Sequence, residues 1–208
     1  MLDDKVRYLQ LAFNEDTRLV SALLPRIPPS NRILIEAGTP YIKREGMNGI
    51  RYIRRLWPGM VMADMKVADG AVGEVHMARA AGADAITVLG NASRETLNLF
   101  IDECSRLNMI SMIDMISVQD PLDTMRMLKN PPDVVVLHLG RDEETTRGKL
   151  IQYRHVNRVR SKFDVILSAA GGVDLKEARS AIFNGASIVV VNLVRPGDGW
   201  VGISIDQD

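Results

Sequence analysis

The sequence predicts a (β/α)8 barrel, and three observations support this fold class. Eight short apolar runs alternate with longer amphipathic segments along the 208 residues. Several runs are apolar at every position, as expected for parallel strands that are covered on both faces. Polar or ionisable residues end most of the runs, where a barrel places its binding groups. No linker or low-complexity tract divides the chain, so residues 1–208 are expected to form a single barrel domain.

The expected strands are short runs rich in Val, Ile, Leu and Met, which suit a buried sheet. We expect them at 8–13, 32–36, 59–64, 84–88, 110–114, 133–138, 164–168 and 187–192. The methionines of the fifth run, between Met109 and Met115, are interpreted as core packing because Met fills irregular space between apolar side chains.

The expected helices occupy the longer segments between the strands. The first ends near Pro28, and the others are expected at 41–56, 72–81, 93–107, 121–128, 149–161 and 175–183. Gly82 and Gly185 suit the left-handed residue that often ends a helix. The sequence ends at Asp208, soon after the eighth strand, so we expect the barrel to lack its last helix. Truncation, or a partner subunit that covers the barrel, would each explain this.

Composition excludes several classes of protein. Lys and Arg number 26 and so do Asp and Glu, so no net charge attracts the chain to nucleic acid or to an anionic membrane. The basic helix expected at 149–161 is interpreted as solvated. Cys104 is the one cysteine, which excludes an internal disulfide. The charged N-terminus and the lack of an apolar run of about 20 residues indicate a cytoplasmic protein.

The candidate functional residues stand where the expected strands end. Successive strand ends of a barrel point into one mouth, so polar groups there converge on one site. His76 and His155 fall inside expected helices among polar neighbours and are interpreted as surface residues. The strand-end residues are Asn14, Glu36, Asp64 with Lys66, Asp114, His138 with Arg141, Gly171 with Gly172, and Asn192.

The densest group is the segment from Asp64 to Asp69 after the third strand. Alternation along the strand puts Asp64 and Lys66 on the same side, facing the mouth. A carboxylate can hold Mg²⁺ together with substrate oxygens, and a nearby ammonium can stabilise a developing oxyanion. The other interpretation of this spacing is an ion pair at the start of a loop.

These motifs resemble the orotidine 5′-monophosphate decarboxylase superfamily, whose signature after the third strand is Asp-x-Lys-x-x-Asp. Along nearly its whole length, the chain resembles the 3-hexulose-6-phosphate synthase branch, and within it the archaeal form that is often fused behind a formaldehyde-activating domain. The matching segments, in the expected order and spacing, are 35–43 (Ile-Glu-Ala-Gly-Thr-Pro-Tyr-Ile-Lys), 63–66 (Ala-Asp-Met-Lys), 87–90 (Thr-Val-Leu-Gly), 114–116 (Asp-Met-Ile) and 170–173 (Ala-Gly-Gly-Val).

The resemblance implies an aldehyde-lyase that depends on Mg²⁺ or Mn²⁺. Enzymes of this branch condense formaldehyde with D-ribulose 5-phosphate to give D-arabino-3-hexulose 6-phosphate, or cleave it, through a metal-stabilised 1,2-enediolate. They act as homodimers. By similarity, Glu36 and Asp64 would hold the metal, Lys66 would neutralise the charge of the enediolate, and Asp69 would reach into the active site of the neighbouring subunit.

Four further residues receive roles on the same basis. His138 ends the sixth strand and is the candidate for proton transfer, because its unperturbed pKa is near 6.5. Arg141 either helps to hold the substrate or is a solvated loop charge. Gly171 and Gly172 would let backbone N–H groups approach a phosphate, or would simply permit a tight turn.

The chain departs from the family pattern at two strand ends. Asn14 stands where the family usually has Asp, and an amide cannot act as a base, although it can bind sugar hydroxyls. The eighth strand ends without the glycine that commonly precedes the phosphate loop, and Arg195 would then supply a charged contact to phosphate.

Two rival functions stay open at this point. A 3-keto-L-gulonate 6-phosphate decarboxylase would share the metal and phosphate sites, but we would expect Glu-Leu in place of Asp114-Met115 there. A barrel that only binds sugar phosphates or a partner protein would explain Asn14 and the altered end of the eighth strand. The presence of Glu36, Asp64, Lys66, Asp69 and His138 favours an enzyme.

Overall fold

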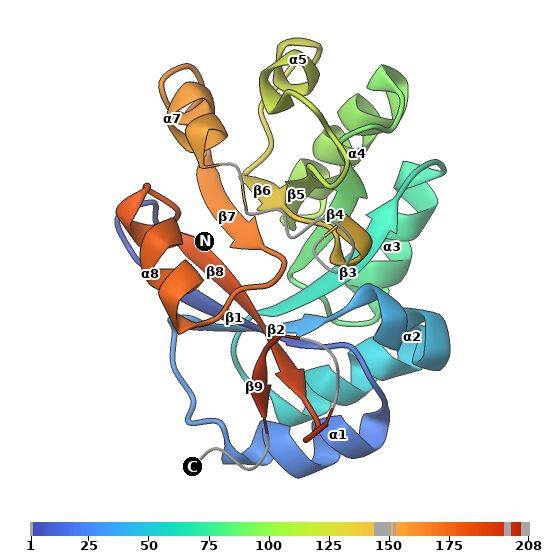
Figure 1. The fold of residues 1–208 in the computed structure, drawn as a ribbon. Helices are drawn as coiled ribbons and strands as arrows, with labels where there is room; N and C mark the ends of the chain where they lie inside the picture. The colour runs from blue at the N-terminus through green and yellow to red at the C-terminus, as the bar shows by residue number, and fades with distance from the viewer. Residues whose placement is uncertain (1, 144–150, 152, 198–200, 205–208) are drawn as a thin grey trace.

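The computed structural model describes residues 2–143, 151, 153–197 and 201–204. Figure 1 shows strands surrounded by helices, and the strand order β1-β2-β3-β4-β5-β6-β7-β8 closes through a parallel pairing of β1 with β8. The expected (β/α)8 barrel is therefore confirmed. Its strands are β1 (Tyr8–Phe13), β2 (Ile33–Ala37), β3 (Val61–Val67), β4 (Ala85–Leu89), β5 (Ile110–Asp114), β6 (Val134–His138), β7 (Ile166–Ala170) and β8 (Ile188–Val194).

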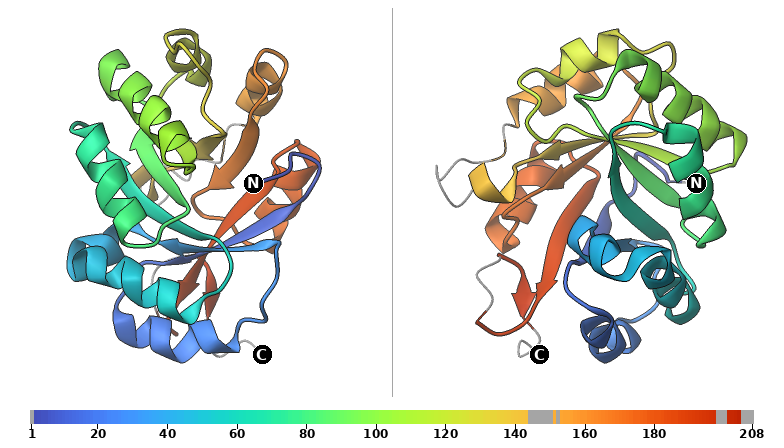
Figure 2. Two further views of the ribbon diagram at one scale, coloured as in Figure 1. Left: turned by 180° about the vertical axis from the view of Figure 1, so that it is seen from behind. Right: turned by 90° about the vertical axis from the view of Figure 1, so that its right-hand side faces the viewer.

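Helices cover the outside of the barrel, as the two views in Figure 2 show. Asp16, Ser93, Asp120 and Asp174 cap four of them through side-chain oxygens that accept backbone N–H groups. The helices are α1 (Thr17–Leu23), the 3-10 turn η1 (Leu24–Arg26), α2 (Thr39–Leu56), α3 (Ala71–Ala80), α4 (Arg94–Arg106), α5 (Pro121–Arg126), α7 (Arg154–Arg160) and α8 (Leu175–Phe183).

Several boundaries differ from those expected. β3, β7 and β8 extend two or three residues beyond their expected C-terminal ends, because parallel pairing with neighbouring strands continues past the apolar runs. The first part of the helix expected at 149–161 lies outside the described residues. In the described part of the chain after β8, a two-residue strand, β9 (Ile203–Ser204), pairs parallel with β8, and no helix occurs.

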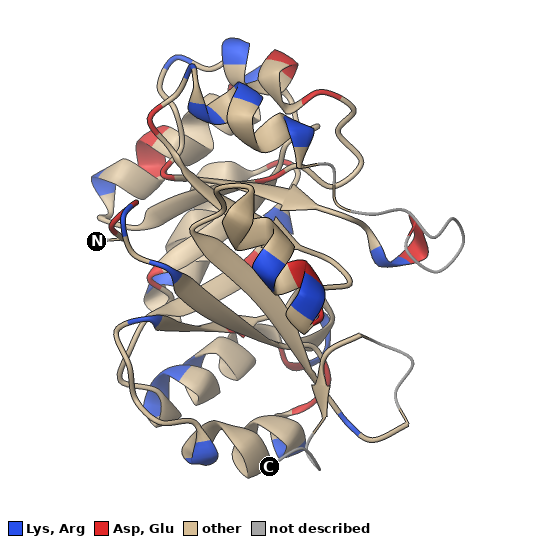
Figure 3. Cartoon of the chain, turned by 60° about the vertical axis from the view of Figure 1, so that its left-hand side comes forward, with Lys and Arg blue, Asp and Glu red and all other residues tan. Residues whose placement is uncertain are grey.

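The apolar core has two parts. Side chains such as Leu34, Met62 and Val134 fill the inside of the barrel, and a larger set that includes Trp57 and Phe100 packs between barrel and helices. Met109, Met112 and Met115 are buried, as expected for core packing. In Figure 3 the strands are almost uncoloured and most charges lie on helices and loops. No helix in the described part of the chain is long and apolar enough to cross a membrane.

One histidine is placed differently from the expectation. His76 is exposed on α3, as expected, but His155 is buried on α7, with a relative exposure of 5%. It lies on the helix face that also buries Val156 and Val159, and its Nδ1 faces Asp120 at 3.8 Å. Burial of this face depends on packing against the α5 region, which its polar neighbours in sequence do not reveal.

Candidate active site

All eight barrel strands contribute to a cavity of about 350 Å³ at their C-terminal ends. Ionisable side chains reach it from β2, β3, β5 and β6, and β4 supplies the hydroxyl of Thr87, whereas β7, β8 and β1 supply glycine, amide and apolar groups. A barrel fold leads us to expect its site at this end. The charged wall consists of Glu36, Asp64, Lys66, Asp114 and His138, and these five residues are called the charged wall below.

Asp64 is held by three side chains. Its Oδ2 accepts hydrogen bonds from Lys66 Nζ at 2.6 Å and from Thr39 Oγ1 at 2.8 Å. Its Oδ1 accepts a hydrogen bond from Thr87 Oγ1 at 2.8 Å. Thr39 begins α2, which follows β2, and Thr87 lies on β4. Residues from the two sides of β3 therefore fix the orientation of this carboxylate.

Lys66 bridges two carboxylates. Its Nζ lies 2.6 Å from Asp64 Oδ2 and 2.9 Å from Asp114 Oδ2. The backbone of Lys66 has a φ of 48°, a left-handed conformation that non-glycine residues seldom adopt, and the β3–β4 register shifts here. Burial alone would lower the pKa of Lys66, but the charges of Asp64 and Asp114 raise it above its usual value. The ammonium is therefore charged at neutral pH.

Asp114 connects Lys66 to His138. The Nδ1 atom of His138 lies 3.0 Å from Asp114 Oδ1 and 2.9 Å from Oδ2. Burial alone would raise the pKa of Asp114, but His138 and Lys66 hold it well below its usual range. Burial alone would lower the pKa of His138, and the Asp114 carboxylate reverses this and raises it. An ionised Asp114 keeps the proton on Nδ1, so Nε2 is the nitrogen that can exchange a proton with a substrate.

Glu36 lies deeper in the barrel and is 6% exposed. Its Oε2 accepts a hydrogen bond from Gln10 Nε2 at 2.6 Å. Burial and, second, the negative charge of Asp64 raise the pKa of Glu36 to about 7. The two carboxylates therefore repel one another across the cavity floor.

These carboxylates fit a divalent cation. No cluster of three or more His, Cys, Asp or Glu side chains suited to a metal occurs among the described residues. Glu36 and Asp64 would supply two oxygens of the hard type that Mg²⁺ prefers, and Mg²⁺ commonly completes its shell with water and substrate oxygens. A cation between them would also remove the repulsion that raises the pKa of Glu36.

The opposite wall, called the neutral wall below, is formed by Asn14, Gly171, Gly172 and Asn192. Gly171 and Gly172 have φ values of 94° and 58°, and a Cβ on Gly171 would lie 2.0 Å from the carbonyl oxygen of Leu139. Only glycine lets the chain pass so close to Leu139 while it turns from β7 towards α8. Asn14 Nδ2 donates to Asn192 Oδ1 at 3.0 Å, which joins the ends of β1 and β8.

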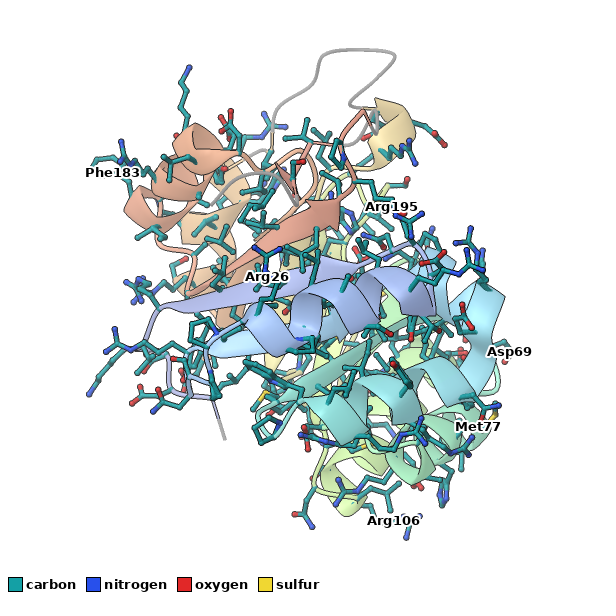
Figure 4. All side chains as sticks on the ribbon, turned by 90° about the horizontal axis from the view of Figure 1, so that it is seen from below. Arg26, Asp69, Met77, Arg106, Phe183 and Arg195 are labelled. Carbon is teal, nitrogen blue, oxygen red and sulfur yellow. The ribbon has the colours of Figure 1, made fainter. Side chains whose placement is uncertain are left out.

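The structure brings most of the sequence-predicted site residues to this cavity, but not all of them. Asn14, Arg141, Gly171 and Gly172 line it together with the charged wall. Asp69 is exposed and does not line it, and Figure 4 shows it at the edge of the molecule. Arg195 does not line it either, because its guanidinium forms ion pairs with Glu15 at 3.1 Å and Asp16 at 2.8 Å.

Sequence reasoning assigned no role at the site to three of its residues. Asp114 was identified only as a strand-end carboxylate in a family segment, and its contacts with Lys66 and His138 depend on the spatial order of β3, β5 and β6. Thr87 was noted only within the family segment 87–90, and Gln10, inside an apolar run, was not singled out. Each faces the barrel interior from its strand, so a polar residue at an inward position of the strand alternation is the signal that finds them.

Known proteins resemble this chain along most of its length. A family model described as orotidine 5′-phosphate decarboxylase / HUMPS family matches residues 7–192. A bifunctional enzyme Fae/Hps of Methanothrix thermoacetophila is 37% identical over 186 residues, which cover 88% of this chain and 47% of that protein. The chain thus spans about half the length of this curated relative.

Solved structures show the same fold. A 3-hexulose-6-phosphate synthase from Salmonella typhimurium superposes with a TM-score of 0.78 at 27% identity, covering 89% of this chain and 88% of that one. The KGPDC of Streptococcus mutans, in complex with a sugar phosphate, has a TM-score of 0.73 at 17% identity, covering 89% of this chain and 88% of that one. The second likeness shows the fold alone.

Proposed function

The chain belongs to the orotidine 5′-phosphate decarboxylase / HUMPS family, and we propose that within this family it acts as a 3-hexulose-6-phosphate synthase. The reaction would join formaldehyde to C1 of D-ribulose 5-phosphate and give D-arabino-3-hexulose 6-phosphate, or run in reverse. The observation that carries the proposal is the linked set Asp64–Lys66–Asp114–His138, which combines a fixed cation with a proton-transfer group in one cavity. The similarity to hexulose-phosphate synthases supports it.

The proton-transfer step belongs to His138. Its Nε2 would take a proton from C1 of the sugar phosphate, and Asp114 would stabilise the imidazolium that results. The electron pair that this leaves on C1 is delocalised into the C2 carbonyl, which gives a 1,2-enediolate. C1 of the enediolate then forms a bond to the formaldehyde carbon as the carbonyl at C2 re-forms, and the former formaldehyde oxygen takes up the proton from the His138 imidazolium, which returns to its neutral form.

Lys66, together with a divalent cation, would stabilise the negative charge of the enediolate. The Lys66 ammonium is held in place by two carboxylates before the substrate arrives, so it needs no reorganisation as the negative charge develops. A divalent cation held by Glu36 and Asp64 would supply Lewis-acid stabilisation to the same oxygens. The backbone of Gly171 and Gly172 would receive the phosphate, and Asn14 would bind a sugar hydroxyl.

The homodimer is part of the proposal. Asp69 is exposed and lies outside the cavity of its own chain, so a role in the reaction requires the site of a second copy. A dimer with shared sites would use it there. Arg195, which is paired at the rim with Glu15 and Asp16, would reach a phosphate only by leaving those partners.

The test is formaldehyde consumption by the purified protein with ribulose 5-phosphate and Mg²⁺, repeated with EDTA and with Mn²⁺. We expect rapid loss of formaldehyde that EDTA stops and either cation restores. A folded protein that consumes no formaldehyde would contradict the proposal. Release of CO₂ from 3-keto-L-gulonate 6-phosphate by the same sample would then identify a decarboxylase. Sugar-phosphate binding without either reaction would identify a binding protein.

A further inference from the structure

We propose that Gln10, which lines the cavity from the inner end of the barrel, is a positioning residue that holds Glu36 so that one of its carboxylate oxygens faces a divalent cation. This inference rests on the cation of the proposed function. It concerns a residue with no part in the proton-transfer chemistry described above.

Gln10 belongs to a layer of four inward-facing side chains. In a barrel of this type, alternate strands contribute to each layer, and the strand registers place Gln10, Met62, Met112 and Ser168 from β1, β3, β5 and β7 at one level. All four are buried, with relative exposures of 1%, 3%, 2% and 1%. Two of them are methionines, which are unbranched and close to glutamine in length. Packing alone therefore does not require an amide at position 10.

The Gln10 amide contributes little to the stability of the core, because one of its two polar atoms has no hydrogen-bond partner. Gln10 Oε1 is buried and has no hydrogen-bond partner among the described residues. An unpaired buried amide oxygen destabilises a fold, so a methionine would serve stability better here. The amide nitrogen, in contrast, donates a short hydrogen bond of 2.6 Å to Glu36 Oε2. The hydrogen bond to Glu36, rather than packing in the core, therefore explains why position 10 is a glutamine.

The contact fixes the orientation of Glu36. Only the amide nitrogen can face an ionised carboxylate, since an amide oxygen would repel it. With Oε2 engaged, Oε1 of Glu36 is the atom left for the cavity, and no hydrogen bond between described residues occupies it. Hydrogen bonds that orient metal-binding carboxylates commonly affect metal affinity by about 10- to 100-fold. Loss of the Gln10 contact would let the Glu36 side chain turn away from Asp64.

The matched variants are Gln10→Met and Ser168→Ala. The first keeps the length of the side chain and removes the donor to Glu36, in a layer that already contains two methionines. The second removes the other buried, unpartnered polar atom of the same layer, Ser168 Oγ, which makes no hydrogen bond to Glu36. Both variants lose one buried polar group, so a general effect of core polarity would appear in both.

The experiment measures binding of Mn²⁺ alone to the whole protein, from the electron paramagnetic resonance signal of free Mn²⁺. We expect the Kd for Mn²⁺ to rise at least about tenfold in Gln10→Met and to stay within about twofold of wild type in Ser168→Ala. Gln10→Asn, whose shorter amide cannot reach Glu36, should behave like Gln10→Met and replaces it if that variant does not fold.

Each outcome decides the proposal. A folded Gln10→Met or Gln10→Asn protein with the Kd of the wild type overturns it, and so does an equal loss of affinity in Ser168→Ala. A wild type that binds no Mn²⁺ also overturns it. Failure of the proposed function alone would give a different pattern. The wild type would bind Mn²⁺ and the variants would show the expected difference in Kd, but the wild type would consume no formaldehyde.

Discussion

The two walls of the cavity are built on opposite physical principles. Strands β2, β3, β5 and β6 contribute the five ionisable side chains of the charged wall, in which Lys66 contacts two carboxylates and His138 contacts one. Strands β7, β8 and β1 contribute Gly171, Gly172 and the Asn14–Asn192 pair. The first wall depends on side-chain charge, and the second depends on backbone conformation and neutral hydrogen bonds.

This difference indicates how the barrel divides its work. A buried charge is expensive unless it is paired, so the charged wall holds its groups in a network that keeps Lys66 and Asp114 ionised. A sugar phosphate brings its own negative charge, and N–H donors can receive it without a buried counter-ion. We therefore assign proton transfer and charge stabilisation to the charged wall and substrate anchoring to the neutral wall.

Removal of the central carboxylate of the charged wall should have the largest effect. Asp64→Asn deletes a proposed cation ligand and one partner of Lys66, and we expect kcat/KM to fall about 10³-fold. Asp123→Asn is the matched control, because Asp123 pairs with Arg126 on the surface of α5 and should retain full activity. Steady-state kinetics of both variants measure this. More than a tenth of wild-type activity in Asp64→Asn would contradict a central role for this carboxylate.

Substitution in the neutral wall should lower the stability of the fold, because this wall depends on backbone conformation. In Gly171→Ala the new Cβ would lie 2.0 Å from Leu139 O at a φ of 94°, and we expect a loss of about 3 kcal/mol or more of unfolding free energy.

Gly70→Ala isolates the effect of backbone conformation. Gly70 has a φ of 64° and a ψ of 29°, in the left-handed region, with no atom within 4 Å of an added Cβ, so the loss should be only about 1–2 kcal/mol. Denaturant unfolding of the two variants gives the comparison. Equal losses would show that the close approach to Leu139 does not constrain this wall.

The Asp114–His138 contact should control the pH dependence of the reaction. In Asp114→Asn the carboxylate that raises the pKa of His138 is gone and burial, which lowers it, remains, so the pKa of the imidazole should fall. A neutral His138 would then persist to lower pH, and the ascending limb of the pH–rate profile should move to lower pH. We also expect a loss of about 10- to 100-fold in kcat, because the imidazolium loses its partner. Imidazole titration by NMR and the pH–rate profile measure both effects, and an unchanged His138 pKa would refute the coupling.

Substitution of Arg195 should have the smallest effect on the reaction. Its exposed guanidinium is engaged by Glu15 and Asp16 outside the cavity, and exposed ion pairs contribute about 0–1 kcal/mol. Arg195→Ala should therefore change the KM for ribulose 5-phosphate less than about threefold. An increase of tenfold or more would show that Arg195 reaches the phosphate and that the neutral wall does not bind it alone.

The sequence predicts the barrel well because its strands are nearly continuous apolar runs and its strand ends carry polar residues. Asp64, Lys66 and His138 stand out for the same reason. The role of Asp114 does not stand out, because its contacts join β3, β5 and β6, which are far apart in sequence. Gln10 and His155 are hidden for a related reason, since local sequence does not show which polar side chains the fold buries. Nor does it show that Arg195 is paired at the rim.

The central claim is that the charged wall moves a proton at C1 of the substrate. Exchange of the C1 hydrogens of ribulose 5-phosphate with D₂O, followed by NMR without formaldehyde, tests this step apart from bond formation. The account predicts exchange by the wild type with Mg²⁺, loss of exchange with EDTA, and a reduction of about 10²- to 10⁴-fold in His138→Gln. Exchange that continues undiminished in His138→Gln would contradict it.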